Sequence, residues 1–289
     1  MITQPAMVNG VETAIRGALR QAAIELRIQV TSWYVLSYVL FPAIGLFVLH
    51  FLQSQRVMGT GVSLAQIGIP GVLTMTLIST GVMGVAGQLI TQREDGTLLR
   101  ARAVPNGMIS HLVAQVIVFT TLSLASIFGL LVIAAVLFTG VAPADAGAWI
   151  TLAWVSVLGL LATLPAGAVL GALMRSPMVL GWTSLVLYGG MAISGIFYPL
   201  GALPGWLQVV GQVLPTYWLG LGLRSALLPA GAVALEVGHS WHHLETAAVL
   251  GVWAVAGILL APVALRRMAR HQSGSLVAAA RDRMMARGH

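Results

Sequence analysis

The chain has 289 residues, of which 58% are hydrophobic and 8% are charged, whereas about 25% are charged in an ordinary soluble domain. Several apolar stretches reach the ~20 residues that cross a hydrocarbon core, so we expect an all-α, polytopic membrane protein. The net charge of +7 comes from arginine, since the chain has no lysine. It has no cysteine either. This composition excludes a P-loop lysine, a Schiff-base lysine, disulfides and thiolate metal sites. No basic stripe interleaved with aromatics is present, so no nucleic-acid partner is expected.

Residues 1–31 are predicted to form a cytoplasmic tail and an amphipathic helix from Val11 to Thr31. At 100° per residue, one face collects the charged residues Glu12, Arg16, Arg20 and Arg27. Another face collects Ile15, Leu19, Ala22 and Leu26. Because this helix precedes an apolar span, it is expected to lie at the membrane interface, with its arginines facing water or lipid phosphates. An ordinary surface helix is the alternative.

A transmembrane domain is predicted over residues 32–265, followed by a basic cytoplasmic tail over 266–289. Its six expected spans are 32–51, 67–90, 109–138, 148–174, 178–197 and 246–265. Small residues in the second span (Thr80, Gly84, Gly87) and a Gly167-x-x-x-Gly171 spacing in the fourth predict close helix packing.

The segment at about 199–228 has two readings. Its apolar parts are each too short to cross a bilayer and are separated by prolines, so they form either one kinked span or a re-entrant pair of half-helices. The positive-inside rule favours the re-entrant pair, with six spans and both termini in the cytoplasm. In that topology only Arg56 and Arg224 lie outside, and the other arginines share the cytoplasmic side.

The loop from Gln88 to Pro105 concentrates charge between two apolar spans. Thr91 and Glu94 fit a capping box that would open a short helix, and Asp95-Gly96 favours a break. Leu98 and Leu99 would then insert in a partner's groove. Arg100 and Arg102 would contact acidic groups or lipid phosphates, and Pro105 would end the element. A plain positive-inside loop is the alternative.

Few other residues suggest chemistry. No Asp, Glu, Lys or Arg lies in the middle of a span, so an ion-coupled mechanism has no obvious carrier. His50 and His111 lie near span ends, where snorkelling or a helix-terminal hydrogen bond accounts for them. The cluster His239, His242 and His243 has no carboxylate in a known zinc pattern, so a solvated loop is the better interpretation.

Two motifs resemble the type-2 permease family of ATP-binding-cassette (ABC) transporters, especially the daunorubicin-resistance-type drug exporters. The first motif is Gln92-Arg-Glu-Asp-Gly-Thr-Leu-Leu-Arg-Ala-Arg-Ala-Val-Pro105. The second is Ser194-Gly-Ile-Phe-Tyr-Pro199, with Leu203-Pro-Gly-Trp-Leu207, Leu214-Pro215 and Leu223-Arg224. The resemblance implies a permease that pairs with a second copy or a sibling permease and with two separate ATPase subunits. ATP and Mg would bind to those partners, and this chain would be a transporter subunit with no cofactor and no catalysis of its own.

The resemblance also assigns roles to residues. A coupling helix at about 91–102 would contact the ATPase through Arg93, Glu94, Asp95, Gly96, Thr97, Leu98, Arg100 and Arg102. An outer gate would use Phe197, Tyr198, Pro199, Pro204, Trp206 and Pro215. A substrate path would use Thr76, Ser79, Thr80, Met83, Trp182, Tyr188 and Met191.

The function implied is ATP-driven export of amphipathic drugs or lipids across the plasma membrane. A polysaccharide or lipid-linked glycan exporter of the same family is the first alternative. From other classes, an intramembrane enzyme would need a catalytic pair that the sequence does not display, and a non-transporting scaffold for an ATPase would lack ATP-stimulated efflux.

Overall fold

The computed structural model describes residues 5–31, 34–56, 62–102, 104, 107–174 and 176–287. Apart from one isolated bridge between Arg56 and Ser63, this part of the chain contains no strand. Its α-helices are α1 (Pro5–Thr31), α2 (Tyr34–Leu52), α3 (Leu64–Ile78), α4 (Val85–Glu94), α5 (Thr97–Arg102), α6 (Gly107–Leu137), α7 (Ala146–Leu173), α8 (Pro177–Ile193), α9 (Gly205–Val213), α10 (Pro215–Leu227) and α11 (His243–Arg287). A π-helical turn, η1 (Ser79–Gly84), joins α3 to α4, and 3-10 turns form η2 (Leu200–Ala202), η3 (Ala230–Leu235) and η4 (Val237–His239). The all-helical fold is confirmed.

Local sequence signals explain where several helices begin. Ser63 and Gln66 form a capping box at the start of α3, in which the Ser63 hydroxyl accepts the Gln66 N–H and the Gln66 side chain accepts the Ser63 N–H. The Asp145 carboxylate accepts the Ala148 N–H at the start of α7 (2.8 Å). Pro177 and Pro215 begin α8 and α10, positions where a missing N–H costs nothing.

Four helical segments among the described residues are long and apolar enough to cross a membrane: Leu64–Glu94, Ser110–Leu137, Ala146–Leu173 and His243–Met268. Two shorter apolar helices, Pro42–Leu52 and Met178–Ile193, overlap the predicted first and fifth spans. The count of six spans therefore stays a prediction. The segment after the fifth predicted span does fold as two short helices, α9 and α10, and their re-entrant placement in a bilayer also stays a prediction.

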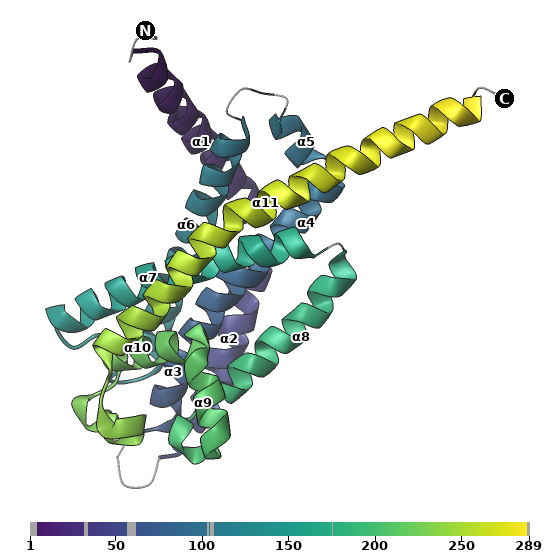
Figure 1. Ribbon diagram of the computed structural model, residues 1–289. Helices are drawn as coiled ribbons and strands as arrows, with labels where there is room; N and C mark the ends of the chain where they lie inside the picture. Colours follow the sequence, from purple (N-terminus) through teal and green to yellow (C-terminus); the bar gives the residue numbers. More distant parts are fainter. Residues whose placement is uncertain are drawn as a thin grey trace.

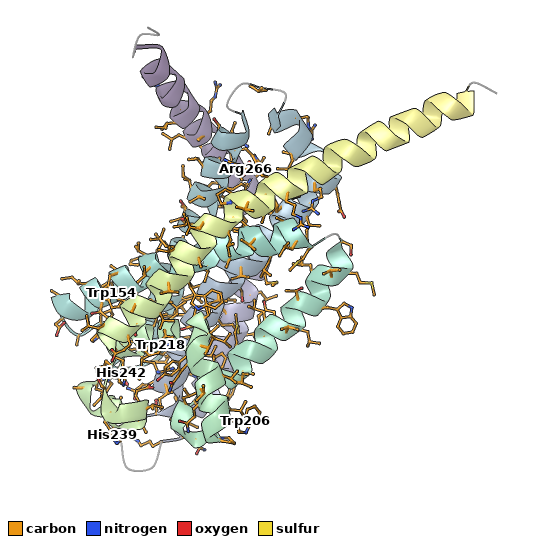
Figure 2. All side chains as sticks on the ribbon, viewed as in Figure 1. Trp154, Trp206, Trp218, His239, His242 and Arg266 are labelled. Carbon is orange, nitrogen blue, oxygen red and sulfur yellow. The ribbon has the colours of Figure 1, made fainter. Side chains whose placement is uncertain are left out.

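The molecule has two distinct ends (Figure 1). One end, called the α5 end below, carries α5 together with the first turns of α1 and the last turns of α11. The opposite end, called the α9 end, carries α9 and the 3-10 turns, with Trp206 and His239 exposed on it (Figure 2). α11 runs unbroken past Arg266 to Arg287, so the predicted basic tail continues the last span as one helix.

α7 occupies the centre of the fold and packs against α4, α10, α11 and η1. Its glycines bring helix backbones into contact. A Cβ added at Gly167 would lie 2.5 Å from the Gly81 carbonyl oxygen, and one added at Gly171 would lie 2.9 Å from the Ala86 Cα. The helix packing predicted from the Gly167-x-x-x-Gly171 spacing is thus confirmed.

The amphipathic helix α1 packs along the first turns of α6. The residues that contact α6 are the small ones, since Ala18 and Ala22 are buried against Ala114 and Val118. Alanine allows the two helices to approach closely, and the larger residues Ile15 and Leu19 stay about half exposed, at 51% and 53%. Of the apolar face predicted from the sequence, Ala22 and Leu26 therefore pack against α6, whereas Ile15 and Leu19 are left exposed by the described residues.

Candidate functional site

The charged loop folds as two helices separated by a single turn. Gly96 adopts φ +74°, a left-handed conformation that glycine takes without strain, and α4 ends beside it. The Asp95 carboxylate accepts the Thr97 backbone N–H (2.9 Å) at the start of α5. Hydrogen bonds from Thr97 lower the pKa of Asp95 below its ordinary value of 3.8, so this carboxylate is charged at neutral pH.

The predicted capping box at Thr91 and Glu94 does not form. α4 continues through both residues, and the Thr91 hydroxyl instead donates to the Gly87 carbonyl one turn earlier. The backbone N–H groups of a continuing helix are already bonded, so no donor is left there for a cap. The break at Asp95-Gly96 was predicted correctly, and the new helix starts after it.

The surface of the α5 end is charged. Glu94, Asp95 and Arg100 are exposed, and the Arg100 guanidinium donates to the Asp95 carbonyl and the Thr97 hydroxyl (3.2 and 3.3 Å). Leu98, in contrast, is 1% exposed. Leu99 and Arg102 belong to α5, and their side chains lie outside the described part of the chain.

The burial of Leu98 corrects the interpretation that it inserts in a partner's groove. It packs with Leu89 and Met268 in an apolar cluster, against which Ala172 and Leu265 also lie. Through Leu98, α5 therefore rests on the ends of α4 and α7 and on the middle of α11. The face that remains for a partner is the charged one.

Arg93 also points inward. Its guanidinium donates to the carbonyls of Met174 (2.7 Å) and Gly171 (2.9 Å) at the end of α7, and it contacts the Met268 sulfur of α11. The sequence placed Arg93 among the residues that contact a partner, whereas the structure places it between helices of its own chain.

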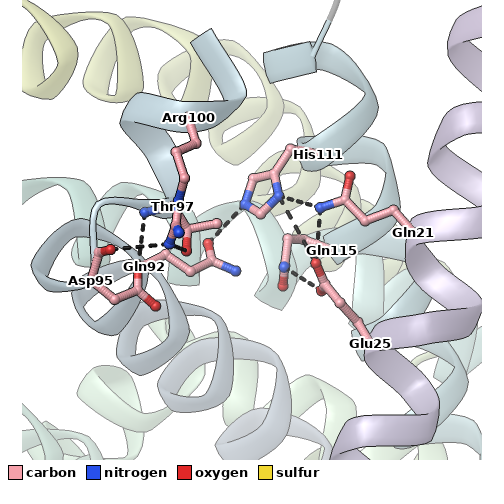
Figure 3. A network of polar contacts seen from close by, with 8 residues as sticks. All are labelled: Gln21, Glu25, Gln92, Asp95, Thr97, Arg100, His111 and Gln115. Carbon is pink, nitrogen blue, oxygen red and sulfur yellow. Dashed lines mark hydrogen bonds and ion pairs between the residues drawn. The ribbon is translucent and has the colours of Figure 1, made fainter. Parts of the chain in front are cut away.

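A polar network lies on the other side of α4 and joins it to α6 and α1 (Figure 3). Gln92 and His111 are buried at 4% and 1% exposure, and the Gln92 amide oxygen lies 2.9 Å from His111 Nε2. Gln21 Nε2 lies 2.6 Å from His111 Nδ1. Glu25 accepts from Gln21 (2.9 Å) and from Gln115 (2.6 Å).

The two glutamines favour one tautomer of His111. With the Gln92 amide oxygen as acceptor, His111 Nε2 donates, and Nδ1 accepts from the Gln21 amide. A neutral ring satisfies both contacts. The sequence located His111 near a span end but gave no sign of its partners, which lie 90 and 19 residues away.

The α9 end is built around a buried ion pair that sequence reasoning missed. Arg224 of α10 donates to both carboxylate oxygens of Glu236 (2.6 and 3.1 Å) and to the Gly195 carbonyl (3.0 Å). Both side chains are buried, at 2% and 4% exposure. Three segments, namely α10, the turns after it and the turn after α8, therefore meet at one guanidinium.

The residues predicted for an outer gate lie in the turns and short helices between α8 and α10. Phe197 and Tyr198 lie in the turn after α8, and the Tyr198 hydroxyl donates to the Ala192 carbonyl. Pro199 precedes η2 and Pro204 precedes α9, on which Trp206 is exposed, and Pro215 begins α10. The structure thus gathers them at the α9 end.

The residues predicted for a substrate path do not share one surface of this chain. Thr76, Thr80 and Met191 are buried against neighbouring helices, and Ser79 and Met83 are partly buried. Trp182 and Tyr188 are exposed on α8.

The three histidines near the α9 end form separate contacts. His242 lies 3.1 Å from the Glu245 carboxylate and 3.0 Å from the Val237 carbonyl, and His239 lies 3.1 Å from the Ala234 carbonyl. The His243 ring lies edge-on to Trp154, with 6.3 Å between the ring centroids. Among the residues that the structure describes, no group of three His, Cys, Asp or Glu side chains is arranged to hold a metal ion.

These features define a multi-pass helical membrane protein with a charged helical elbow at one end and a braced pair of short helices at the other. The protein-family model described as "ABC-2 family transporter protein" matches residues 52–265, which is most of the chain. The chain therefore belongs to the ABC-2 transporter family and is a transporter component. No curated protein matches it.

Proposed function

We propose that the chain is the permease subunit of an ATP-driven exporter, powered by separate ABC ATPase subunits that dock on the α5 end. The proposal rests on the charged segment formed by the end of α4, the turn at Asp95-Gly96 and α5. Glu94 and Asp95 are exposed at the end of the most enclosed span, Leu64–Glu94, and Arg100 is exposed on the short helix α5 that follows it. In this proposal the α5 end and both termini face the cytoplasm, where ATP is present.

The composition of the spans also favours a partner ATPase as the source of energy for transport. Among the described residues, the buried Asp, Glu and Arg side chains are Arg224 and Glu236, which pair with each other, so no unpaired buried carboxylate is available to carry a proton or a cation. The buried His111 has both ring nitrogens in hydrogen bonds. The family adds that such a chain is one part of a transporter.

The path for cargo is proposed to lie between this chain and a second permease, either another copy or a sibling. Trp182 (63%) and Tyr188 (43%) are exposed on α8 and would face it, with Phe197 near its closed end. These aromatic surfaces favour an amphipathic drug or lipid as cargo. The turns and short helices at the α9 end would close the path on the outer side.

The test is reconstitution with candidate partners. The chain is co-expressed with each ABC ATPase subunit of the same genome that lacks a membrane domain, and complexes that co-purify are placed in proteoliposomes. ATP-dependent movement of daunorubicin, followed by its fluorescence, is the readout. Movement with ATP and none with a non-hydrolysable analogue is the expected result.

Substitutions on the exposed face of the α5 end test whether the ATPase docks there. Glu94→Ala and Arg100→Gln should reduce co-purification of the ATPase and leave the yield and melting temperature of the permease unchanged. If both variants bind the ATPase as the wild type does, the docking site is not at α5.

A further inference from the structure

The guanidinium of Arg93 occupies the end of α7. A helix leaves its last carbonyls without intrahelical donors, and a cation there is favoured by the helix dipole. α7 ends at Leu173, the chain turns extended at Met174, and Arg93 donates to the Gly171 and Met174 carbonyls on both sides of that point. Arg93 is thus a cap supplied by a different helix.

The fit requires arginine and a glycine opposite it. Two carbonyls are bonded by two different nitrogens of one planar group, Nη1 and Nη2, which the single ammonium of a lysine reproduces poorly. Gly171 permits the close approach, since an added Cβ would lie 3.0 Å from the Ala86 carbonyl of α4.

Apolar contacts surround the Arg93 guanidinium, and together with its hydrogen bonds they form what is called the Arg93 joint below. The Met268 sulfur of α11 touches the Arg93 guanidinium, and Met268 packs with Leu89 of α4 and Leu98 of α5. The ends of α4 and α7 and the middle of α11 therefore meet at the Arg93 side chain, and Leu98 of α5 packs in the cluster beside it. The neighbouring residue Gln92 faces the opposite way, toward His111 of α6.

We propose that Arg93 is a positioning residue that holds the end of α4, and with it α5, against α7 and α11. A displacement of α5 by a docked ATPase would then move these helices together. Arg93 acts inside the permease and does not contact the ATPase. This inference rests on the proposed function, because it assigns the route by which docking at α5 reaches the spans.

The test separates binding from coupling. Arg93→Gln is compared with Arg100→Gln, which changes an exposed arginine seven residues further along. Arg93→Gln should co-purify with the ATPase as the wild type does, while ATP-driven daunorubicin movement falls about tenfold or more, because hydrogen bonds from a charged donor are lost. Arg93→Lys should recover part of the coupling, and Arg100→Gln should lose ATPase binding first.

A second measurement uses the permease alone. Because the chain has no cysteine, the pair Leu89→Cys and Ala172→Cys, which replaces two members of the apolar cluster on α4 and α7, reports on the joint by oxidative cross-linking. Adding Arg93→Gln should slow cross-linking at least about tenfold for the same reason, and adding Arg100→Gln should leave its rate unchanged.

Three results would overturn the inference: loss of ATPase binding in Arg93→Gln to the same degree as in Arg100→Gln, wild-type transport in Arg93→Gln, or unchanged cross-linking. If Arg93→Gln does not accumulate in membranes, Arg93→Lys is measured in the same assays and must show intermediate coupling with full ATPase binding. Slowed cross-linking together with no ATPase binding by the wild type would instead count against the proposed function and leave the joint standing.

Discussion

Arg93 and Arg224 show how the two ends of the molecule use the same side chain differently. At the α5 end, Arg93 bonds neutral carbonyls near the surface. At the α9 end, Arg224 is 2% exposed and forms a two-pronged pair with Glu236. If Arg93 moves away, water can replace it on the carbonyls. If Arg224 moves away, a carboxylate is left charged and buried, which is far more costly.

The difference indicates which end tolerates small movements of its helices. The joint at Arg93 holds helix ends whose partners stay satisfied after small movements, whereas the Arg224–Glu236 pair holds three segments in one arrangement. A movement of α5 is therefore expected to carry α4, α7 and α11 with it through Arg93, with small adjustments of the bonds at that side chain, and to move the α9 end as a unit.

The largest expected effect comes from breaking the buried pair on one side. Glu236→Gln leaves Arg224 charged and without its carboxylate partner, and removal of one partner of a buried pair costs about 3–5 kcal/mol. We expect a marked fall in the melting temperature of the purified permease, measured in detergent by intrinsic tryptophan fluorescence.

The double variant Arg224→Met, Glu236→Leu is the control for that experiment. Replacing both partners removes the uncompensated charge, so the double variant should be more stable than Glu236→Gln. A double variant less stable than the single one would show that the pair itself, and not the orphaned charge, sets the stability of the α9 end.

The second effect tests the packing that joins both ends through α7. Gly167→Ala places a Cβ against the Gly81 and Val82 carbonyls, at 2.5 and 2.7 Å, which are backbone atoms that cannot rotate away. Overpacking of this kind costs about 1–3 kcal/mol. Gly181→Ala is the matched control, because an added Cβ there has no neighbour within 4 Å. Equal melting temperatures for the two variants would contradict the close contact.

A third, smaller effect is expected at the polar network of the α5 end. His111→Phe removes the ring nitrogens that bond Gln92 and Gln21. Gln92 is buried and loses its partner, at a cost of about 1–3 kcal/mol, and the partly exposed Gln21 recovers water. The melting temperature should fall less than in Glu236→Gln, and proteolysis should become faster in α1, which the network holds against α6.

His111→Gln serves as its comparison, because an amide can donate to Gln92 over a similar distance. A smaller fall in stability than in His111→Phe is expected. Identical behaviour of the two variants would mean that ring volume, and not the hydrogen bonds, matters at this position.

The sequence predicted the features that depend on neighbouring residues. The all-helical fold follows from composition. The break at Asp95-Gly96 follows from the ability of glycine to adopt a left-handed conformation. The prolines between α8 and α11 mark the boundaries of two short helices. The Gly167-x-x-x-Gly171 spacing predicted close packing because a missing side chain is visible in the sequence itself.

The features that were missed depend on contacts between distant residues. Arg93 and Leu98 turn inward because the end of α7 and the middle of α11 lie beneath them, and these contacts come from residues far away in the sequence. The local sequence also does not set the rotation of α5 after the break at Gly96. The partners of His111 and Arg224 likewise come from other helices and turns. A local pattern identifies a polar side chain, while the tertiary fold decides what it bonds.

The smallest expected effect concerns His242, at the surface of the α9 end. A hydrogen bond that the protonated His242 ring donates to the Glu245 carboxylate raises the pKa of His242 above its ordinary value of 6.5. Since the folded protein binds this proton more tightly than the unfolded chain, the added stability is present below about pH 6.5 and is lost as the pH rises through the raised pKa. A titration of the His242 ring followed by NMR should show the raised pKa, and Glu245→Gln should bring it down toward 6.5. An unchanged pKa in Glu245→Gln would mean that the Val237 carbonyl, the other partner of this ring, holds the proton instead.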